Sequence, residues 1–205
     1  DEWENVTIPS LDEEIELSGW WAETNPGGPT VLLIHGVRSC KENHVIILQG
    51  SMLHNAGFNV LAIDLRDHGN STIEDMRVSA GQKEWRDVAG AWEWLQDEQG
   101  VPKEQIGILG NSMGAATVAI TFSLEEDVQA VWLDSSYHDM TRIINSELQR
   151  LSLPTMFTSA GIYAGIFSAG EDITAHEPYE AVRNVGERSI FIVHNEADER
   201  VAFVH

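Results

Sequence analysis

The sequence predicts an α/β fold, built on a mostly parallel sheet with helices on both of its faces. The first observation is a set of short apolar runs typical of strands covered on both faces, at residues 31–34, 60–65, 106–109, 130–133 and 189–193. The second is that helical patterns at residues 41–56 and 82–99 separate several of these runs. Strands and helices that alternate in this way predict a parallel sheet between two helical layers.

The length and composition predict one domain over residues 1–205. The chain has 205 residues, of which 42% are hydrophobic, and this is enough to bury a sizeable core. Two runs at residues 5–9 and 15–21 flank the acidic turn LDEE and predict an N-terminal antiparallel hairpin at the edge of the sheet. A cluster of chain-breaking residues at 25–29 then leads into the first buried strand.

Both helical patterns end at a glycine. The helix at 41–56 ends before Gly57, and the helix at 82–99 ends before Gly100. In the second helix, apolar residues from Trp85 to Leu95 recur at steps of three and four, which is the spacing of a buried helical face. We therefore expect its tryptophans in the core and not in a binding site.

A different pattern follows the strand at 130–133. Residues 137–185 carry helical and small apolar segments but no strand pattern, which predicts a helical cap inserted into a core of residues 1–136 and 186–205. The apolar side chains of this cap are expected either to line a pocket or to bury one another. They are Met156, Phe157, Ile162, Tyr163, Ile166 and Phe167.

The charge and the single cysteine exclude several classes of protein. The formal net charge is −21 and only three lysines are present, so nucleic acid and anionic membranes, which require clustered basic residues, are not expected as partners. The acidity fits either a salt-adapted host or an ordinary acidic surface. One cysteine, Cys40, excludes an internal disulfide and a cysteine-rich zinc site, and we expect it to be an ordinary loop thiol.

Signals for membranes, export and nucleotides are missing from the sequence. No apolar run has the length needed to cross a bilayer, and the first residues, DEWENVTIPS, have neither a basic nor an apolar signal region. The sequence thus predicts a soluble segment without membrane contact. Neither GxxxxGK[ST] nor GxGxxG occurs, which argues against a nucleotide enzyme.

The stretch GNSMG, residues 110–114, carries the strongest chemical signal. It lies between the strand at 106–109 and a small-residue helical segment, which is the context of a GxSxG nucleophile elbow. Such a turn would expose the Ser112 hydroxyl and direct the N–H of Met113 at a developing negative charge. The alternative is one of the glycine-rich turns that join strands to helices in many α/β proteins.

Two other strand ends hold candidate residues. His35 and Gly36 end the strand at 31–34, so the N–H of Val37 is a candidate second donor to an oxyanion, although a simple turn is the alternative. His68 follows the strand at 60–65 and is expected to bond its own backbone, not to act as a base. The last strand, 189–193, leads into His194 and then Asp198.

The order of these motifs resembles that of the α/β-hydrolase fold, and specifically its small esterase-like members with a helical cap. The motifs are a strand followed by HG, DLRxHG, GxSxG, and a late strand followed by AD-x-R-V. The resemblance covers nearly the whole chain. It implies Ser112 as nucleophile, Asp198 as the acid that orients a histidine, with Asp134 as second choice, and the backbone N–H groups of Val37 and Met113 as the oxyanion hole. It further implies a small-molecule acyl substrate and no metal or organic cofactor.

The chain departs from this pattern at its end. His194 is followed by Asn195 where the family usually has glycine, and His205, the only histidine after Asp198, falls where the family begins its next helix. The resemblance thus implies that the C-terminal part of the fold, with the catalytic histidine, lies beyond residue 205. Two readings remain, a fragment of an active serine hydrolase or a catalytically silent scaffold that binds a small apolar ligand. Dehalogenase and epoxide hydrolase chemistry is disfavoured because those relatives carry a carboxylate in place of Ser112.

Overall fold

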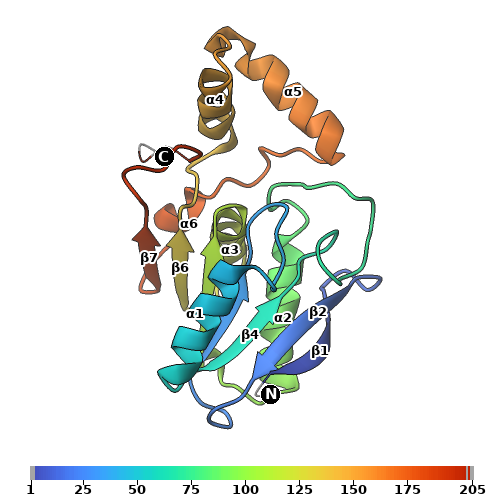
Figure 1. Cartoon of the computed structure of the whole chain (residues 1–205), viewed down its shortest axis with the longest axis vertical. Helices are drawn as coiled ribbons and strands as arrows, with labels where there is room; N and C mark the ends of the chain where they lie inside the picture. The colour runs from blue at the N-terminus through green and yellow to red at the C-terminus, as the bar shows by residue number, and fades with distance from the viewer. Residues whose placement is uncertain (1–2, 202, 204–205) are drawn as a thin grey trace.

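The computed structural model describes residues 3–201 and 203 and contains one seven-stranded sheet (Figure 1). Its strand order is β1-β2-β4-β3-β5-β6-β7. The strands are β1 (Glu4–Pro9), β2 (Glu16–Ala22), β3 (Thr30–Ile34), β4 (Asn59–Ile63), β5 (Ile106–Asn111), β6 (Ala130–Asp134) and β7 (Ser189–Val193). Pairing is antiparallel for β1 with β2 and for β2 with β4, and parallel between all later neighbours. The predicted fold, a mostly parallel sheet with an N-terminal hairpin at its edge, is confirmed.

Helices cover both faces of the sheet. They are α1 (His44–Asn55), α2 (Trp85–Asp97), α3 (Met113–Leu124), α4 (Met140–Arg150), α5 (Thr158–Ala169) and α6 (Glu180–Arg183), with short 3₁₀ helices η1 (Lys103–Gln105) and η2 (Thr155–Phe157). On one face α1 buries Ile46 against a small cluster with Leu33, Val60 and Leu109. The opposite face of the sheet packs against α2 and α3 in a larger apolar core. This core contains Trp92 of α2, as the helical spacing predicts.

Three boundaries differ from the sequence expectation. Helix α1 begins at His44 and not at residue 41, since the Asn43 side chain accepts the Val45 N–H at 2.9 Å and so caps the helix. Helix α2 begins at Trp85 and not at residue 82. Strand β4 ends at Ile63 and not at residue 65, although the N–H of Asp64 still donates to the Ser18 carbonyl beside β2 at 2.9 Å.

Residues 137–185 rise above the carboxyl edge of the sheet. Figure 1 shows α4 and α5 as a pair that stands beyond the ends of the strands. Between Tyr137 and Val185 the structure has helices and loops and no strand. A separate apolar cluster, which includes Met140 of α4 and Ala169 of α5, packs this pair onto Ala116 in the first turns of α3. In the described part of the chain no helix is long and apolar enough to cross a membrane.

Candidate active site

Ser112 occupies a strained turn between β5 and α3. Its φ is 55° and its ψ is −120°, a backbone conformation that residues other than glycine rarely adopt. The two flanking glycines are required by sterics. A Cβ on Gly110 would lie 2.4 Å from the carbonyl oxygen of Gly114, and a Cβ on Gly114 would lie 2.4 Å from that of His35. The sequence GNSMG therefore folds as a tight elbow that only glycine allows at these two positions.

The backbone of Ser112 is fixed while its hydroxyl is left free. Its N–H donates to the Asp134 carbonyl on β6 at 2.8 Å, and its carbonyl accepts the N–H of Ala116 in α3 at 3.1 Å. The side chain is half-buried, and its Oγ has no hydrogen-bond partner among residues 3–201 and 203. Strain and an unpaired hydroxyl at one residue are features that proteins keep at functional sites.

Two backbone amides lie beside this hydroxyl. Met113 is the first residue of α3, so no carbonyl of its own helix can accept its N–H. The N–H of Val37 likewise has no partner in the described part of the chain. A Cβ on Gly36 would lie 3.3 Å from the Cβ of Ser112, so the loop after β3 passes directly against the serine. Val37, Ser112 and Met113 border the same cavity.

Two histidines hold the loop that carries Val37. His68 accepts the N–H of Arg38 on Nε2 at 3.3 Å, and its Nδ1 donates to the Arg66 carbonyl at 2.8 Å. His35 accepts the N–H of Leu65 on Nε2 at 3.1 Å and donates from Nδ1 to the carbonyl of Gly36 at 2.7 Å. Burial lowers the pKa of His35 to about 4 and keeps this ring neutral. Both rings are thus committed to the backbone, so neither is available as a base for Ser112.

A buried ion pair anchors the far end of the same loop. Lys41 donates to Asp64 from Nζ at 2.6 Å and from its backbone N–H at 2.6 Å, and both side chains are only 1% exposed. The Asp64 carboxylate also accepts the N–H of Asn70 at 2.9 Å. Because a buried charge is stable only when it is paired, the pair fixes the loop after β3 to the loop after β4.

Asp198 lies on the loop after β7. One carboxylate oxygen accepts the backbone N–H groups of Arg200 at 2.8 Å and Val201 at 2.9 Å, and the other lies 3.7 Å from Nε2 of His194. The His194 ring itself donates to the Val201 carbonyl at 2.7 Å. Arg200 and Val201 line the cavity at Ser112, so the fold brings the Asp198 loop to the elbow, although Asp198 does not itself line the cavity.

The other predicted residues are placed as follows. Asp134 ends β6, accepts the Ser135 hydroxyl at 3.0 Å and lines a second cavity beside Ser112. His205 lies outside the described residues. Among the described histidines, none lines either cavity.

The expectation for the apolar side chains of the cap is met only in part, because Ile166 packs half-buried against the cluster of Met140 and Ala169 whereas others are exposed. Met156, Tyr163 and Phe167 are 81%, 73% and 88% exposed, so they neither line a pocket nor bury one another. The cavity at Ser112 is instead lined by Met140 and Ile143 of α4. The sequence contained no signal for this, because periodicity identifies an apolar helix face but not the surface that it contacts.

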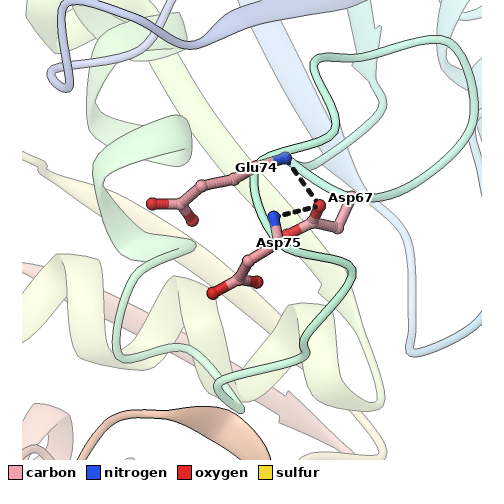
Figure 2. Close-up of side chains that lie close together, drawn as sticks. All are labelled: Asp67, Glu74 and Asp75. Atoms are coloured by element: carbon pink, nitrogen blue, oxygen red, sulfur yellow. Dashed lines mark hydrogen bonds between the residues drawn. The ribbon is translucent and has the colours of Figure 1, made fainter.

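One cluster of carboxylates has the spacing of a metal site. Oxygens of Asp67, Glu74 and Asp75 lie within 4.8 Å of one another, and Figure 2 shows Asp67 accepting backbone N–H groups of the other two. The ammonium of Lys83, however, lies 3.2 Å from Glu74 and 3.0 Å from Asp75. Since a lysine already supplies the positive charge, we assign this cluster to the structure of its loop.

Comparison with known proteins agrees with this architecture. The prolyl oligopeptidase family matches residues 44–205. The esterase Pf2001 of Pyrococcus furiosus is 25% identical, with a TM-score of 0.74 over 99% of this chain and 74% of its own. XC6422 of Xanthomonas campestris, described as an α/β serine hydrolase without lid, is 15% identical, with a TM-score of 0.64 over 99% of this chain and 75% of its own, and shows the fold alone.

The curated relatives are longer than this chain. An uncharacterized 31.7 kDa protein of Escherichia coli is 25% identical over 70% of this chain and 49% of its own length. An uncharacterized protein of Mycobacterium tuberculosis is 26% identical over 66% of this chain and 47% of its own length. The chain thus spans about half the length of the curated relatives it matches. With the family match and the sheet topology together, the chain belongs to the prolyl oligopeptidase family, within the α/β-hydrolase superfamily.

Proposed function

We propose that the protein is a serine hydrolase that cleaves an ester or a related acyl bond through a covalent acyl-serine. The observation that carries the proposal is the strained Ser112, whose free hydroxyl borders one cavity together with two backbone amides. The family match and the likeness to an esterase at 25% identity support the same reaction class. No metal or organic cofactor is required by this chemistry.

Each group has one role in the proposed reaction. Ser112 Oγ attacks the carbonyl carbon, and the N–H groups of Val37 and Met113 donate to the oxygen that becomes negative. A histidine removes the proton of Ser112 and then passes it to the leaving group, which departs as the acyl-serine forms. The histidine then removes a proton from a water molecule, which attacks the acyl-serine. The acid is released, and the histidine returns the proton to Ser112. Asp198 orients the histidine, with Asp134 as the second candidate.

The proposal requires a catalytic histidine outside residues 3–201 and 203. His35 and His68 are bonded to the backbone, His194 donates to Val201, and no other histidine in this range lines a cavity at Ser112. The lack of an available histidine among the described residues also favours the second candidate function, a scaffold that binds a small apolar ligand without turnover. Loss of the histidine of such a triad costs on the order of 10⁶ in kcat, so the two functions differ greatly in rate.

A fluorophosphonate probe and p-nitrophenyl butyrate separate these functions. In the full-length protein, which supplies the catalytic histidine, we expect labelling and hydrolysis that Ser112→Ala abolishes, while Ser123→Ala, at the far end of the same helix, retains both. Labelling that survives Ser112→Ala would remove Ser112 from the mechanism. Saturable binding of the ester with neither labelling nor turnover would establish the scaffold.

A further inference from the structure

Two cavities of different chemistry flank Ser112. One, of about 310 Å³, lies on the α1 side and is lined largely by polar side chains such as Ser39, Asn111 and Asp134. The other, of about 210 Å³, lies beneath α4. We call the second the α4 cavity, and only this one contains Val37 and Met113 with Ser112.

The walls of the α4 cavity are apolar and firmly held. Met113, Tyr137 and Val201 are each less than a tenth exposed, and Tyr137 and Val201 belong to the cluster that packs the cap onto α3. The hydroxyl of Tyr137 donates to the Ala80 carbonyl at 3.1 Å, so its polar end is already satisfied. Ile143 of α4 is half-buried and completes the wall. A preformed apolar surface of this kind binds apolar groups.

Charge argues for an uncharged occupant. Glu147 and Arg200 are the two charged residues of the lining, and Glu147 is already paired with Arg150 at 2.7 Å. A charged group pushed between Met113, Tyr137 and Ile143 would lose its hydration, and Arg200 is exposed to solvent, so an ion pair with it would offset little of that cost.

Size argues for a short occupant. Since a water molecule takes about 30 Å³ in the liquid, and a methylene is of similar size, about 210 Å³ holds roughly seven non-hydrogen atoms. The carbonyl group at Ser112 takes part of this room. A chain of about four to six carbons therefore fills the cavity, and longer chains must extend out of it.

We propose that the α4 cavity is the acyl subsite of the enzyme, that it accepts uncharged aliphatic acyl chains of about four to six carbons, and that Ile143 sets this length. The inference rests on the proposed function, because it takes the two amides at Ser112 as the place of the carbonyl oxygen. It adds the substrate class and the residue that selects it.

The test is a series of p-nitrophenyl esters from acetate to decanoate, assayed with the full-length protein. Ile143→Trp narrows the cavity and is expected to lower kcat/KM for hexanoate at least tenfold while acetate changes by about twofold or less, since one methylene in an apolar pocket is worth about 10- to 200-fold. Ile143→Ala is expected to move the optimum to longer chains. Ile144→Ala is the matched control, because Ile144 of the same helix faces Gly161 of α5 and is expected to leave the optimum unchanged.

A second series makes the result independent of turnover. Alkylboronic acids of two to eight carbons bond directly to a serine oxygen, and calorimetry should give the same length preference and the same shift in Ile143→Trp. An optimum that is unaffected by both Ile143 variants, in esters and boronic acids alike, overturns the subsite. Absence of ester hydrolysis with a length-dependent boronic acid series retains the subsite and rejects only the proposed hydrolase function.

Discussion

The turn at Ser112 requires glycine at two positions, because the backbone leaves no room there for a Cβ atom. Gly110 and Gly114 meet backbone atoms at 2.4 Å when a Cβ is placed on them, whereas Gly107, on the same strand, meets nothing closer than the Ala130 carbonyl at 4.0 Å. The strand itself therefore tolerates alanine, and the turn after it does not. This contrast separates the need for glycine at the elbow from the general cost of altering β5.

Gly110→Ala is expected to lower the free energy of unfolding by about 3 kcal/mol or more, because backbone atoms must move to admit the methyl group. Gly107→Ala should be neutral or stabilising by up to about 1 kcal/mol, since it reduces the entropy of the unfolded chain. Urea unfolding of the two variants and the wild type provides the measurement. Equal losses in both variants would mean that the elbow is not sterically constrained as described.

The sequence predicts the residues that border the cavity but not the side chains that hold these residues in place. The sequence predicts Ser112, Val37 and Met113 as site residues because each follows a predicted strand, and the structure gathers them at one cavity. The bond from His68 to the Arg66 carbonyl confirms that this ring bonds its own backbone. The N–H that His68 accepts from Arg38 and the pairing of Lys41 with Asp64 depend instead on contacts between two loops. Contacts of this kind leave no local pattern in the sequence.

Helix α4 forms one wall of the α4 cavity, and the carboxyl group of Glu177 holds the first turn of this helix. Glu177 accepts the N–H of Met140 at 3.0 Å. Burial raises the pKa of Glu177 to about 7, and the carboxylates of Asp139, Glu180 and Asp172 act in the same direction against the Met140 hydrogen bond. Glu177 is therefore largely protonated in the folded protein below neutral pH.

The sign of the resulting pH dependence follows from this raised pKa. Between pH 4.5 and 7 the unfolded chain has lost the Glu177 proton and the folded chain keeps it, so the stability from this group falls as pH rises and is lost above pH 7. Glu177→Gln cannot titrate and keeps an acceptor for Met140. We expect the wild type to lose stability relative to Glu177→Gln between pH 5 and 8, as measured by urea unfolding. Glu187→Gln, at an exposed site, is the control, and a wild-type advantage that grows with pH would contradict the assignment.

For the whole molecule, the sequence predicted the layers of the fold but not how the cap lies on them. The strand at 189–193 and the hairpin have the predicted positions because buried strands and turns leave strong local patterns. The sequence predicts that Met156, Tyr163 and Phe167 are covered, but in the structure they are exposed. Their burial depends on what packs against α5, and hydrophobic periodicity does not identify that partner.

The net charge of the protein affects the stability of the whole fold. A charge of −21 opposes compaction through repulsion among exposed carboxylates, while the strongest ion pairs, such as Lys41 with Asp64, are buried and little screened by salt. Exposed pairs such as Lys103 with Asp127 contribute little to stability, because water and salt screen them. Added salt therefore removes more repulsion than attraction.

Raising NaCl from 0.05 to 1 M at pH 7 is expected to increase the unfolding midpoint by several degrees, since the screening length falls from more than 10 Å to about 3 Å. The same series at pH 4.5, close to the isoelectric point, is the control, because the net repulsion is nearly absent there. Differential scanning calorimetry measures both series. A midpoint that stays flat at pH 7 would show that the acidic surface carries no net repulsive cost. An equal rise at both pH values would assign the effect to the salting-out of apolar surface and not to charge.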